Sequence, residues 1–328
     1  MVKSDIRIKF LGFSAGGGAM EARPFYKLLK ANYNLLDGED YVVFNGLEDC
    51  FRYENSIKIF LNAENTVPDF NTFDYSVGFD DLAFGDRYIR HPLFARYSSY
   101  PLLAERKKEP DASLLTRKFC SFVVSNSEFA DPMREKFFRR LSQYKKVDSG
   151  GRFLNNVGGP VKDKLAFLRE YKFNIAFENS VSPGYTTEKI MEAYAAQSIP
   201  IYYGNPTVET DFRLNSMVRI KDESDIDRAI EEIIRLDNDN VAYMEMVTAR
   251  CLTEDDPGIY DKRLLAFLTH IFEQPLELAR RRNRYGCQAG IARRMRMLQS
   301  AEQWIRGSFL WRVAMKAHVF MKKSGFWG

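Results

Sequence analysis

The sequence is poor in the residues that build zinc sites and disulfide frameworks. Four cysteines and three histidines are spread over 328 residues, and no two cysteines form a CxxC pair. Zinc sites and small disulfide-stapled folds need such residues at close spacing. Neither class is therefore expected, and free thiols favour a reducing, cytosolic setting.

Long apolar runs are also missing. No stretch reaches the roughly 18 uncharged apolar residues of a membrane span, and residues 1–17 lack the apolar core and cleavage pattern of a secretion signal. Residues 280–328 carry twelve lysines and arginines against one acid, Glu302, so the remaining chain is acidic although the total is +4. An acidic body argues against nucleic-acid binding, which needs a basic patch on the fold itself.

A glycine-rich dinucleotide fingerprint is absent as well. The triplet 16–18 is all glycine, but the sixth position of the pattern is Glu21, and no acid closes a second strand at the right distance. We interpret the triplet as a flexible loop facing a cleft. Two adjacent carboxylates, Asp80 and Asp81, are a weak metal signal, and no metal site is expected.

What the chain does contain is a regular alternation of apolar runs and helical patterns. Strands are expected at 6–13, 41–46, 56–62, 75–79, 119–126, 172–179, 199–205 and 217–222. Helices are expected at 21–33 and near 130–144, 187–197, 224–236, 239–251 and 259–274. This rhythm is typical of parallel sheets covered by helices. A charged, proline-containing segment at 104–113 is interpreted as a linker. We predict two doubly wound α/β domains, 1–105 and 106–280, facing a cleft, and a tail, 281–328.

Two cations stand where ligands of parallel sheets bind. Ligands bind beyond the carboxyl ends of strands, close to helix N-termini. Arg134 and Lys189 each fall in the first turns of a helix that follows a predicted strand. A positive charge there opposes the helix dipole unless an anion compensates it. Surface solvation would explain either cation alone, but the two together indicate a diphosphate site.

Three further residues lie beside Lys189. Glu188 either complements the helix dipole or accepts hydrogen bonds from sugar hydroxyls. Asn179 and Tyr185, on the preceding loop, could hydrogen-bond to a nucleotide or stack on it. Together with the two cations they form the predicted binding site for a nucleotide sugar.

The segment "YKFNIAFENSVSPGYTTEKIMEAYAAQSIPIYYGNP" resembles the signature of the α-1,3/4-fucosyltransferases, glycosyltransferase family 10, especially its bacterial branch. Further similar stretches are "FLNAENTVPDFNTFDYSVGFDD", "DRYIRHPLF" and "KFCSFVVSN", so the resemblance runs from about residue 56 to 275. It implies a GT-B fold of two Rossmann-like domains. It also implies inverting transfer of L-fucose from GDP-β-L-fucose to a hydroxyl of an N-acetylglucosamine or glucose unit.

The resemblance also assigns residues to roles. Glu64, expected at the end of the third strand, matches the family's general base, although a surface acid at a strand end is the simpler alternative. Arg134 and Lys189 match the diphosphate-binding cations. The donor-contacting positions of the family are matched by Asn179, Tyr185 and Glu188. No obligatory cofactor is implied, and a divalent cation would at most stimulate the reaction.

The expected function is therefore an α-1,3-fucosyltransferase that builds Lewis-type surface glycans on β-galactoside acceptors. Its partners would be GDP-fucose and an N-acetyllactosamine-like oligosaccharide. Two alternatives stay open: a GT-B enzyme that uses another nucleotide sugar, and a membrane-bound nucleotide-binding scaffold without catalysis. The second would not need Glu64, Arg134, Glu188 and Lys189, all of which are present. The acceptor glycan, the choice of α-1,3 or α-1,4 linkage and the oligomeric state are left open.

The tail, beyond the domain rhythm, has helical periodicity. Apolar residues recur at helical spacing, opposite basic ones: Ile291, Met295, Leu298, Ala301, Ile305, Phe309, Val313, Ala317 and Phe320. The same segment contains three tryptophans, Trp304, Trp311 and Trp327. This pattern predicts a basic amphipathic helix that lies on an anionic membrane. A cytoplasmic protein bound to the inner face of the cytoplasmic membrane is expected, and a helix packed on the body is the alternative.

Overall fold

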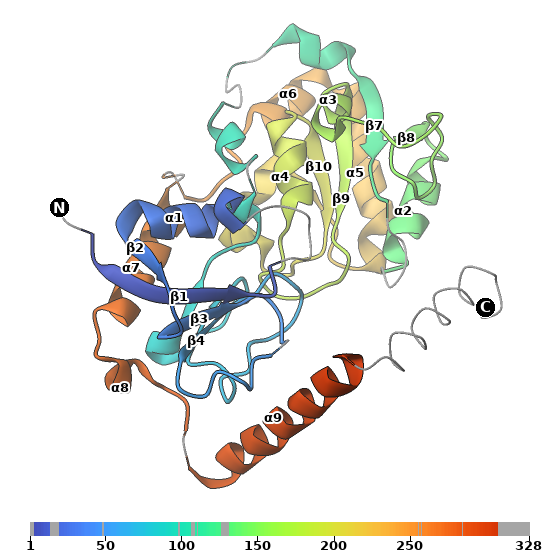
Figure 1. Cartoon of the computed structure of the whole chain (residues 1–328). Coiled ribbons are helices and arrows are strands. Elements are labelled where there is room, and N and C mark those ends of the chain that lie inside the picture. Colours follow the sequence, from blue (N-terminus) through green and yellow to red (C-terminus); the bar gives the residue numbers. More distant parts are fainter. Residues whose placement is uncertain are drawn as a thin grey trace.

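The computed structural model contains two parallel sheets, one in each domain (Figure 1). It describes residues 3–13, 20–47, 49–97, 99–105, 109, 111–125, 131–254, 256, 258–283 and 285–307. The glycine triplet 16–18, part of the predicted linker and the tail beyond 307 lie outside these residues.

The first sheet has six strands in the order β2-β1-β3-β4-β5-β6, all parallel. Their bounds are β1 Asp5–Leu11, β2 Asn34–Asp37, β3 Tyr41–Phe44, β4 Ile57–Leu61, β5 Tyr75–Gly78 and β6 Tyr88–Arg90. β3, β4 and β5 are buried along their whole length, as expected where both faces of a parallel sheet are covered.

The second sheet has five parallel strands in the order β11-β10-β9-β7-β8. Their bounds are β7 Lys118–Phe122, β8 Val147–Ser149, β9 Tyr171–Phe177, β10 Ile199–Tyr203 and β11 Val218–Arg219. Every residue of the central strands β9 and β10 is buried. The two sheets agree with the predicted GT-B-type arrangement.

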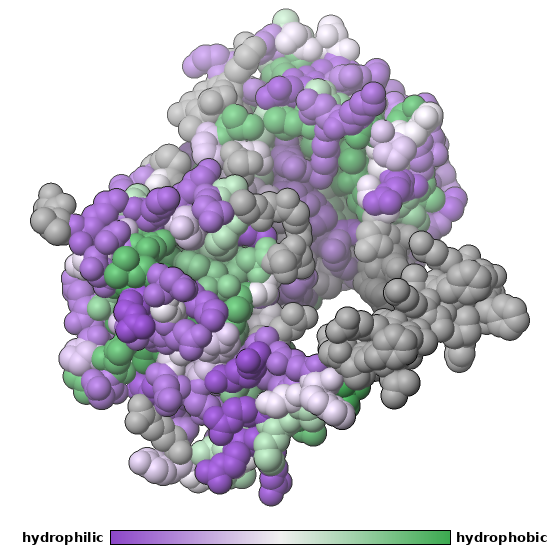
Figure 2. All heavy atoms as spheres, in the orientation of Figure 1, coloured by the Kyte–Doolittle hydropathy of each residue, from purple (hydrophilic) through white to green (hydrophobic). Residues whose placement is uncertain are grey.

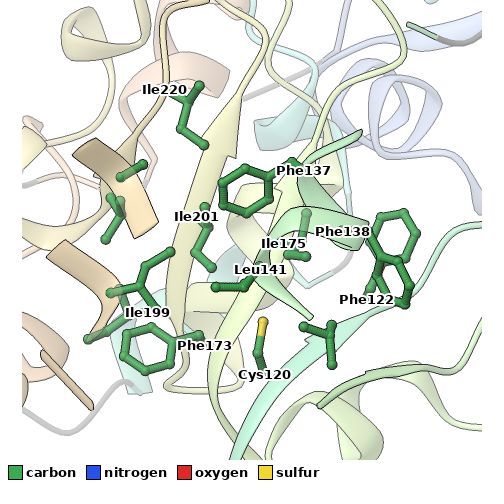
Figure 3. Close-up of a cluster of buried hydrophobic side chains, with 14 of the residues drawn as sticks. Cys120, Phe122, Phe137, Phe138, Leu141, Phe173, Ile175, Ile199, Ile201 and Ile220 are labelled. Atoms are coloured by element: carbon green, nitrogen blue, oxygen red, sulfur yellow. The ribbon is translucent and has the colours of Figure 1, made fainter. Parts of the chain in front are cut away.

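Nine α-helices occur among the described residues. They are α1 Pro24–Asn32, α2 Met133–Leu141, α3 Lys164–Leu168, α4 Glu188–Ala195, α5 Ile226–Asn238, α6 Asn240–Thr248, α7 Ile259–Phe272, α8 Leu276–Ala279 and α9 Gly286–Gly307. In the second domain α2 packs Phe137 and Leu141 on β7, β9 and β10, where they meet Phe173 and Ile201 (Figure 3). Burial of each such side chain stabilises the fold by about 1.5–3 kcal/mol.

The two domains do not divide the chain at the predicted boundaries, residues 105 and 280. α7 returns to the first domain, where Leu264, Leu268 and Ile271 join the core of β1, β3 and β4. In the other direction, Tyr100 and Leu103 pack with α4 and β10 of the second domain. The prediction that 106–280 forms the second domain alone is therefore wrong for α7, whose apolar stripe carries no information about which sheet it covers.

The tail helix α9 lies outside both sheets, on the side of the first domain (Figure 1). Gln299 Oε1 accepts a hydrogen bond from the Phe51 amide at 3.3 Å, and Gln303 Oε1 accepts one from Arg52 at 3.1 Å. Several apolar side chains of α9 stay exposed: Ile291, Met295, Met297, Leu298, Trp304 and Ile305. In Figure 2 green side chains accordingly stand beside purple ones along α9.

Candidate active site

The loops that follow β4 and β9 meet between the two domains. The side chain of Asn65, on the first loop, donates a hydrogen bond to the Ser180 hydroxyl on the second at 2.7 Å. Figure 2 shows this face of the molecule hollowed between the two domains, with hydrophilic side chains along the hollow. The sequence-predicted residues 64 and 179–189 are therefore brought together at the carboxyl ends of their sheets, where ligands of such sheets bind.

Lys189 has a carboxylate partner within the protein. Its ammonium lies 3.0 Å from Glu178 Oε2 and donates to the Thr187 hydroxyl at 2.9 Å. Glu178, at the end of β9, is fully buried and also accepts the Thr187 amide at 2.8 Å and hydroxyl at 2.7 Å. The protein itself thus supplies an anion that compensates Lys189. Glu178 was missed because a strand-end acid gives no sign of its partner.

The same carboxylate shapes the charge of Lys189. Burial lowers the pKa of the Lys189 ammonium, but the charges of Glu178 and Glu188 outweigh burial, so its pKa lies above the ordinary value. For Glu188 the balance is reversed: burial raises its pKa, while Lys189 and Lys164 lower it, and the net shift is downward. Both groups are thus charged at neutral pH, as a binding site for a diphosphate and a sugar requires.

Arg134 is held differently, by a backbone carbonyl and a side-chain amide oxygen. It is 2% exposed, and its Nη2 donates to the Phe177 carbonyl at 2.8 Å and to Asn179 Oδ1. Its buried Nε has no hydrogen-bond partner among the described residues. Burial lowers the pKa of its guanidinium, although Glu178 opposes this. A desolvated guanidinium with a spare donor is suited to a phosphate oxygen, and Asn179 has the role of positioning it.

Tyr185 makes a contact between the two domains. It is 7% exposed, and its ring packs on Phe79 of the first domain at a centroid distance of 5.3 Å, with Leu93 in the same cluster. The sequence suggested that Tyr185 hydrogen-bonds to a nucleotide or stacks on it, and this stays a prediction. In the structure the ring joins the two domains beside the cleft.

Glu64 lies in the loop three residues beyond β4, not at a strand end, and it is exposed. β4 is the fourth strand of the chain. It was expected as the third, because β2 has no apolar pattern of its own and was not predicted. The fully buried Asn62 shapes the loop: its Oδ1 accepts the Glu64 amide at 3.2 Å and the Thr66 hydroxyl at 3.3 Å. Glu64 faces the second domain closely enough to contribute to raising the pKa of Tyr185, after burial and Glu178.

A cavity of about 240 Å³ lies beside the Glu64 loop on the first domain. Its lining is mostly apolar with a few polar groups and includes Phe13, Phe25, Leu61, His91, Arg96 and Tyr97. One of these residues, His91, belongs to the "DRYIRHPLF" stretch that carries part of the family resemblance. Pockets of this composition, apolar with few oriented polar groups, are typical of small-ligand sites.

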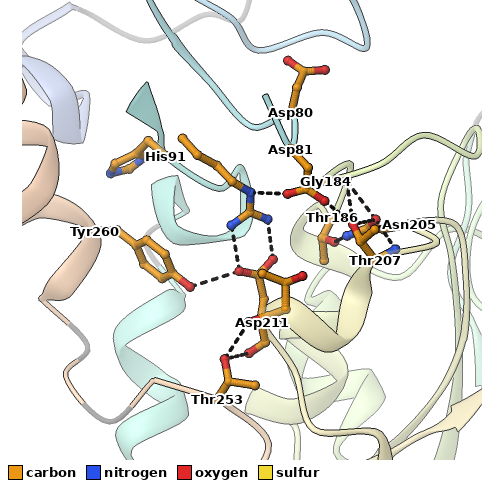
Figure 4. Close-up of polar contacts among 12 residues, drawn as sticks. Asp80, Asp81, His91, Gly184, Thr186, Asn205, Thr207, Asp211, Thr253 and Tyr260 are labelled. Carbon is orange, nitrogen blue, oxygen red and sulfur yellow. Dashed lines mark hydrogen bonds and ion pairs between the residues drawn. The ribbon is translucent and has the colours of Figure 1, made fainter. Parts of the chain in front are cut away.

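An ionic network joins the two domains (Figure 4). Arg90 at the end of β6 donates to both carboxylate oxygens of Asp211 at 2.9 and 2.6 Å and contacts Asp81 at 2.9 Å. Tyr260 of α7 donates to Asp211 at 3.1 Å, and Thr207 donates to Asp81. Asp81 thus has a structural role between the domains. Among the described residues, no group of three or more histidines, cysteines and acids could hold a metal ion.

Comparisons with known proteins agree with this geometry. The family model "glycosyltransferase family 10 (fucosyltransferase) C-term" matches residues 115–251, and that of the "alpha-(1,3)-fucosyltransferase FucT N-terminal domain" matches 8–97. The alpha-(1,3)-fucosyltransferase FucT of Helicobacter pylori is 37% identical over 259 residues, covering 67% of this chain and 54% of that protein. The chain thus spans about half the length of this relative.

Solved structures give the same result. A crystal structure of an α1,3-fucosyltransferase with GDP-fucose is 30% identical, with a TM-score of 0.70, covering 84% of this chain and 92% of that one. Another α1,3-fucosyltransferase crystal structure is 28% identical, with a TM-score of 0.73, covering 87% and 94% of the two chains.

Proposed function

The chain belongs to glycosyltransferase family 10, the fucosyltransferases, and we propose that it transfers L-fucose from GDP-β-L-fucose to a sugar hydroxyl. The proposed acceptor is a β-galactoside with an N-acetylglucosamine or glucose unit, linked α-1,3 in Lewis-type glycans. The observation that carries this proposal is the hydrogen bond between Asn65 and Ser180, which holds the loop of Glu64 against the loop that leads to Lys189.

The second domain would bind the donor. Arg134, with its spare Nε, and Lys189 would hold the diphosphate at the N-termini of α2 and α4, where helix dipoles favour negative charge. Glu188 would accept hydrogen bonds from ribose or fucose hydroxyls. These fixed cations would stabilise the leaving GDP, which is often the largest contribution to catalysis. We therefore expect no obligatory metal, and activity should survive treatment with EDTA.

The first domain would activate the acceptor. Glu64 takes the proton of the acceptor hydroxyl while that oxygen bonds to the fucose anomeric carbon. The bond between this carbon and the β-phosphate oxygen breaks in the same step, and its electron pair leaves with GDP. Attack from the face opposite the leaving group converts the β-linked donor into an α-linked product. The cavity beside Glu64 would hold the acceptor, with aromatic and leucine side chains against the sugar's apolar face.

The test is transfer from GDP-fucose to lactose, N-acetyllactosamine and its β-1,3 isomer, with linkage analysis of each product. We expect an α-1,3 product on N-acetyllactosamine. A panel of other nucleotide sugars, with GDP as competitor, is the matched control. Transfer from another donor, or tight GDP binding without any transfer, would contradict the proposal.

We further propose that the protein is peripherally bound to the inner face of the cytoplasmic membrane through α9. Of the described helices none is both long enough and apolar enough to cross a bilayer. α9 instead exposes apolar side chains, and Trp304 is 79% exposed. The same helix carries arginines such as Arg293 and Arg294. Such a helix binds anionic lipid surfaces.

The corresponding experiment removes residues 286–328 and measures co-sedimentation with anionic vesicles and transfer activity. We expect loss of sedimentation with activity retained, because the cleft lies between the domains. A truncated protein that sediments as well as the full chain would refute membrane binding through α9 without affecting the enzymatic proposal.

A further inference from the structure

A second cavity, of about 150 Å³, lies on the first domain away from the cleft. It is bounded by the beginning of β4, the segment 280–283 and the first turn of α9, whose Gln288 and Ala289 contribute to its lining. Its volume is well above the roughly 10–15 Å³ that one water molecule needs. Unlike the pocket beside Glu64, it has polar groups over about half of its lining.

The central group of this cavity is a buried lysine. Lys58, the second residue of β4, is 1% exposed, and its side chain lines the cavity. Among the described residues its ammonium forms no ion pair and no hydrogen bond, and Glu54 and Asp74 act on it through their charges. Burial, followed by the charge of Arg282, lowers the pKa of Lys58 to about 8. It is therefore still a cation at neutral pH.

Two arginines beside Lys58 are held in place by the chain. Arg282 donates to Asp74 Oδ2 at 2.8 Å and to the Ser56 carbonyl at 2.7 Å, and Asp74 is fully buried. Arg280 donates to the carbonyls of residues 54 and 55. The cationic side chains that line the cavity, Lys58, Arg280 and Arg282, outnumber the acidic ones. The one acid in it is Glu54, whose buried Oε1 has no hydrogen-bond partner among the described residues.

The beginning of α9 adds a second feature that favours anions. The first amides of a helix have no partners within the helix, and the dipole is positive at that end. α9 has 22 residues and starts at Gly286, next to the cavity. The amide side chains of Asn71 and Gln288 also line the cavity and offer neutral donors.

From the unpaired buried Lys58, the fixed arginines and the helix start around one cavity, we propose that this site binds a phosphate group. The group comes either from a soluble phosphate compound or from a lipid headgroup, since the cavity is formed partly by the helix that we place on the membrane. The competing structural explanation is an internal Lys58–Glu54 pair bridged by water. The two explanations predict opposite effects when Glu54 is neutralised.

The first experiment titrates the full chain with inorganic phosphate in a calorimeter, with GDP saturating the cleft. We expect saturable binding that Lys58→Gln weakens about tenfold or more, because a charge-assisted hydrogen bond is lost. Glu54→Gln should tighten binding, because it removes the only negative charge from the lining. Binding that GDP abolishes, that Lys58→Gln leaves unchanged or that Glu54→Gln weakens would overturn the proposal.

Folding is controlled in the same series. GDP affinity equal to that of the wild type shows that a variant is folded, since Lys58 lies far from the cleft residues in the sheet. If Lys58→Gln fails this control, Gln288→Ala is used instead: the side chain is exposed at the start of α9, and its loss should weaken phosphate binding by a few-fold. Unchanged phosphate affinity in Gln288→Ala and Glu54→Gln would then overturn the proposal.

The second experiment identifies the source of the phosphate. Wild type and Lys58→Gln are compared on vesicles of phosphatidylcholine with and without phosphatidic acid. A lipid source predicts that the variant loses affinity only for vesicles with phosphatidic acid. A soluble source predicts equal vesicle binding by both proteins, with the difference confined to inorganic phosphate. No difference in either assay would overturn the proposal.

Discussion

The two sides of the cleft present their charges in opposite ways. On the second domain Glu178 is fully buried, Arg134 is 2% exposed, and the Lys189 side chain is 16% exposed, all held by short hydrogen bonds. On the first domain Glu64 is exposed, and its backbone amide donates to Asn62. The groups proposed to hold GDP are thus preorganised in a dry site. The proposed base stays open to water and to the acceptor until the acceptor covers it.

The sharpest way to test this contrast is Glu64→Gln. We expect transfer to fall by about 10²–10⁴-fold, the typical contribution of a general base, with GDP affinity and folding stability unchanged because the side chain is exposed. Turnover rates and calorimetric GDP binding check both parts. Glu39→Gln, another exposed acid of the first domain, is the matched control and should keep full activity. Turnover within a few-fold of wild type would show that Glu64 is not the base.

The opposite behaviour is expected of Glu178→Gln. Removing the fully buried partner leaves Lys189 only the more exposed Glu188, at 3.5 Å, so the free energy of unfolding should fall by about 3–5 kcal/mol. Denaturation in urea measures it. The double variant Glu178→Gln/Lys189→Met should regain most of the loss, because both charges are then gone. A loss below about 1 kcal/mol, the size expected of an exposed ion pair, would show that the pair is not desolvated as the structure indicates.

The two donor-side cations can be separated from each other. Arg134→Gln and Lys189→Ala should each raise the Kd for GDP by about tenfold to a hundredfold, and slow transfer, because a charge-assisted contact to the diphosphate is lost. Lys189→Ala should in addition lower stability, since it leaves Glu178 buried and unpaired. Calorimetry with GDP, together with urea denaturation, distinguishes the two effects. Unchanged GDP affinity in either variant would exclude that cation from the diphosphate site.

The smallest expected effect concerns the pH dependence of the first domain. His91 is 4% exposed, and burial lowers its pKa, against the opposing effect of Asp261 at 3.3 Å; Arg96 contacts the other ring nitrogen. The unfolded chain therefore takes up a proton more readily than the folded one. This contribution to stability is complete above the unfolded pKa of about 6.5 and is lost as pH falls through it.

Urea denaturation at several values from about pH 8 to about pH 5 measures this dependence. We expect the loss of stability on the acid side to be smaller in His91→Gln than in wild type, whereas His270→Gln, with an exposed side chain, should retain it. An equal loss of stability at acid pH in wild type and His91→Gln would show that His91 does not contribute to this pH dependence.

Much of the fold followed from local pattern. All central strands of both sheets were predicted within a few residues, because strands covered on two faces appear as continuous apolar runs. The three missed strands, β2, β6 and β8, are short and lie at sheet edges. Edge strands bury less of their apolar surface, so they need no continuous apolar run. The tail helix was predicted as far as the structure describes it.

For the site, the sequence by itself determined the chemical groups and their order. Arg134 and Lys189 lie in helices that follow strands, and the resemblance to the family suggests Glu64 as the general base. Only the tertiary structure decided which groups meet. Glu178 compensates Lys189, Tyr185 packs on Phe79, and α7 returns to the first sheet. The physical reason is that a periodic pattern records which side of an element is buried, but not which partner, distant in sequence, buries it.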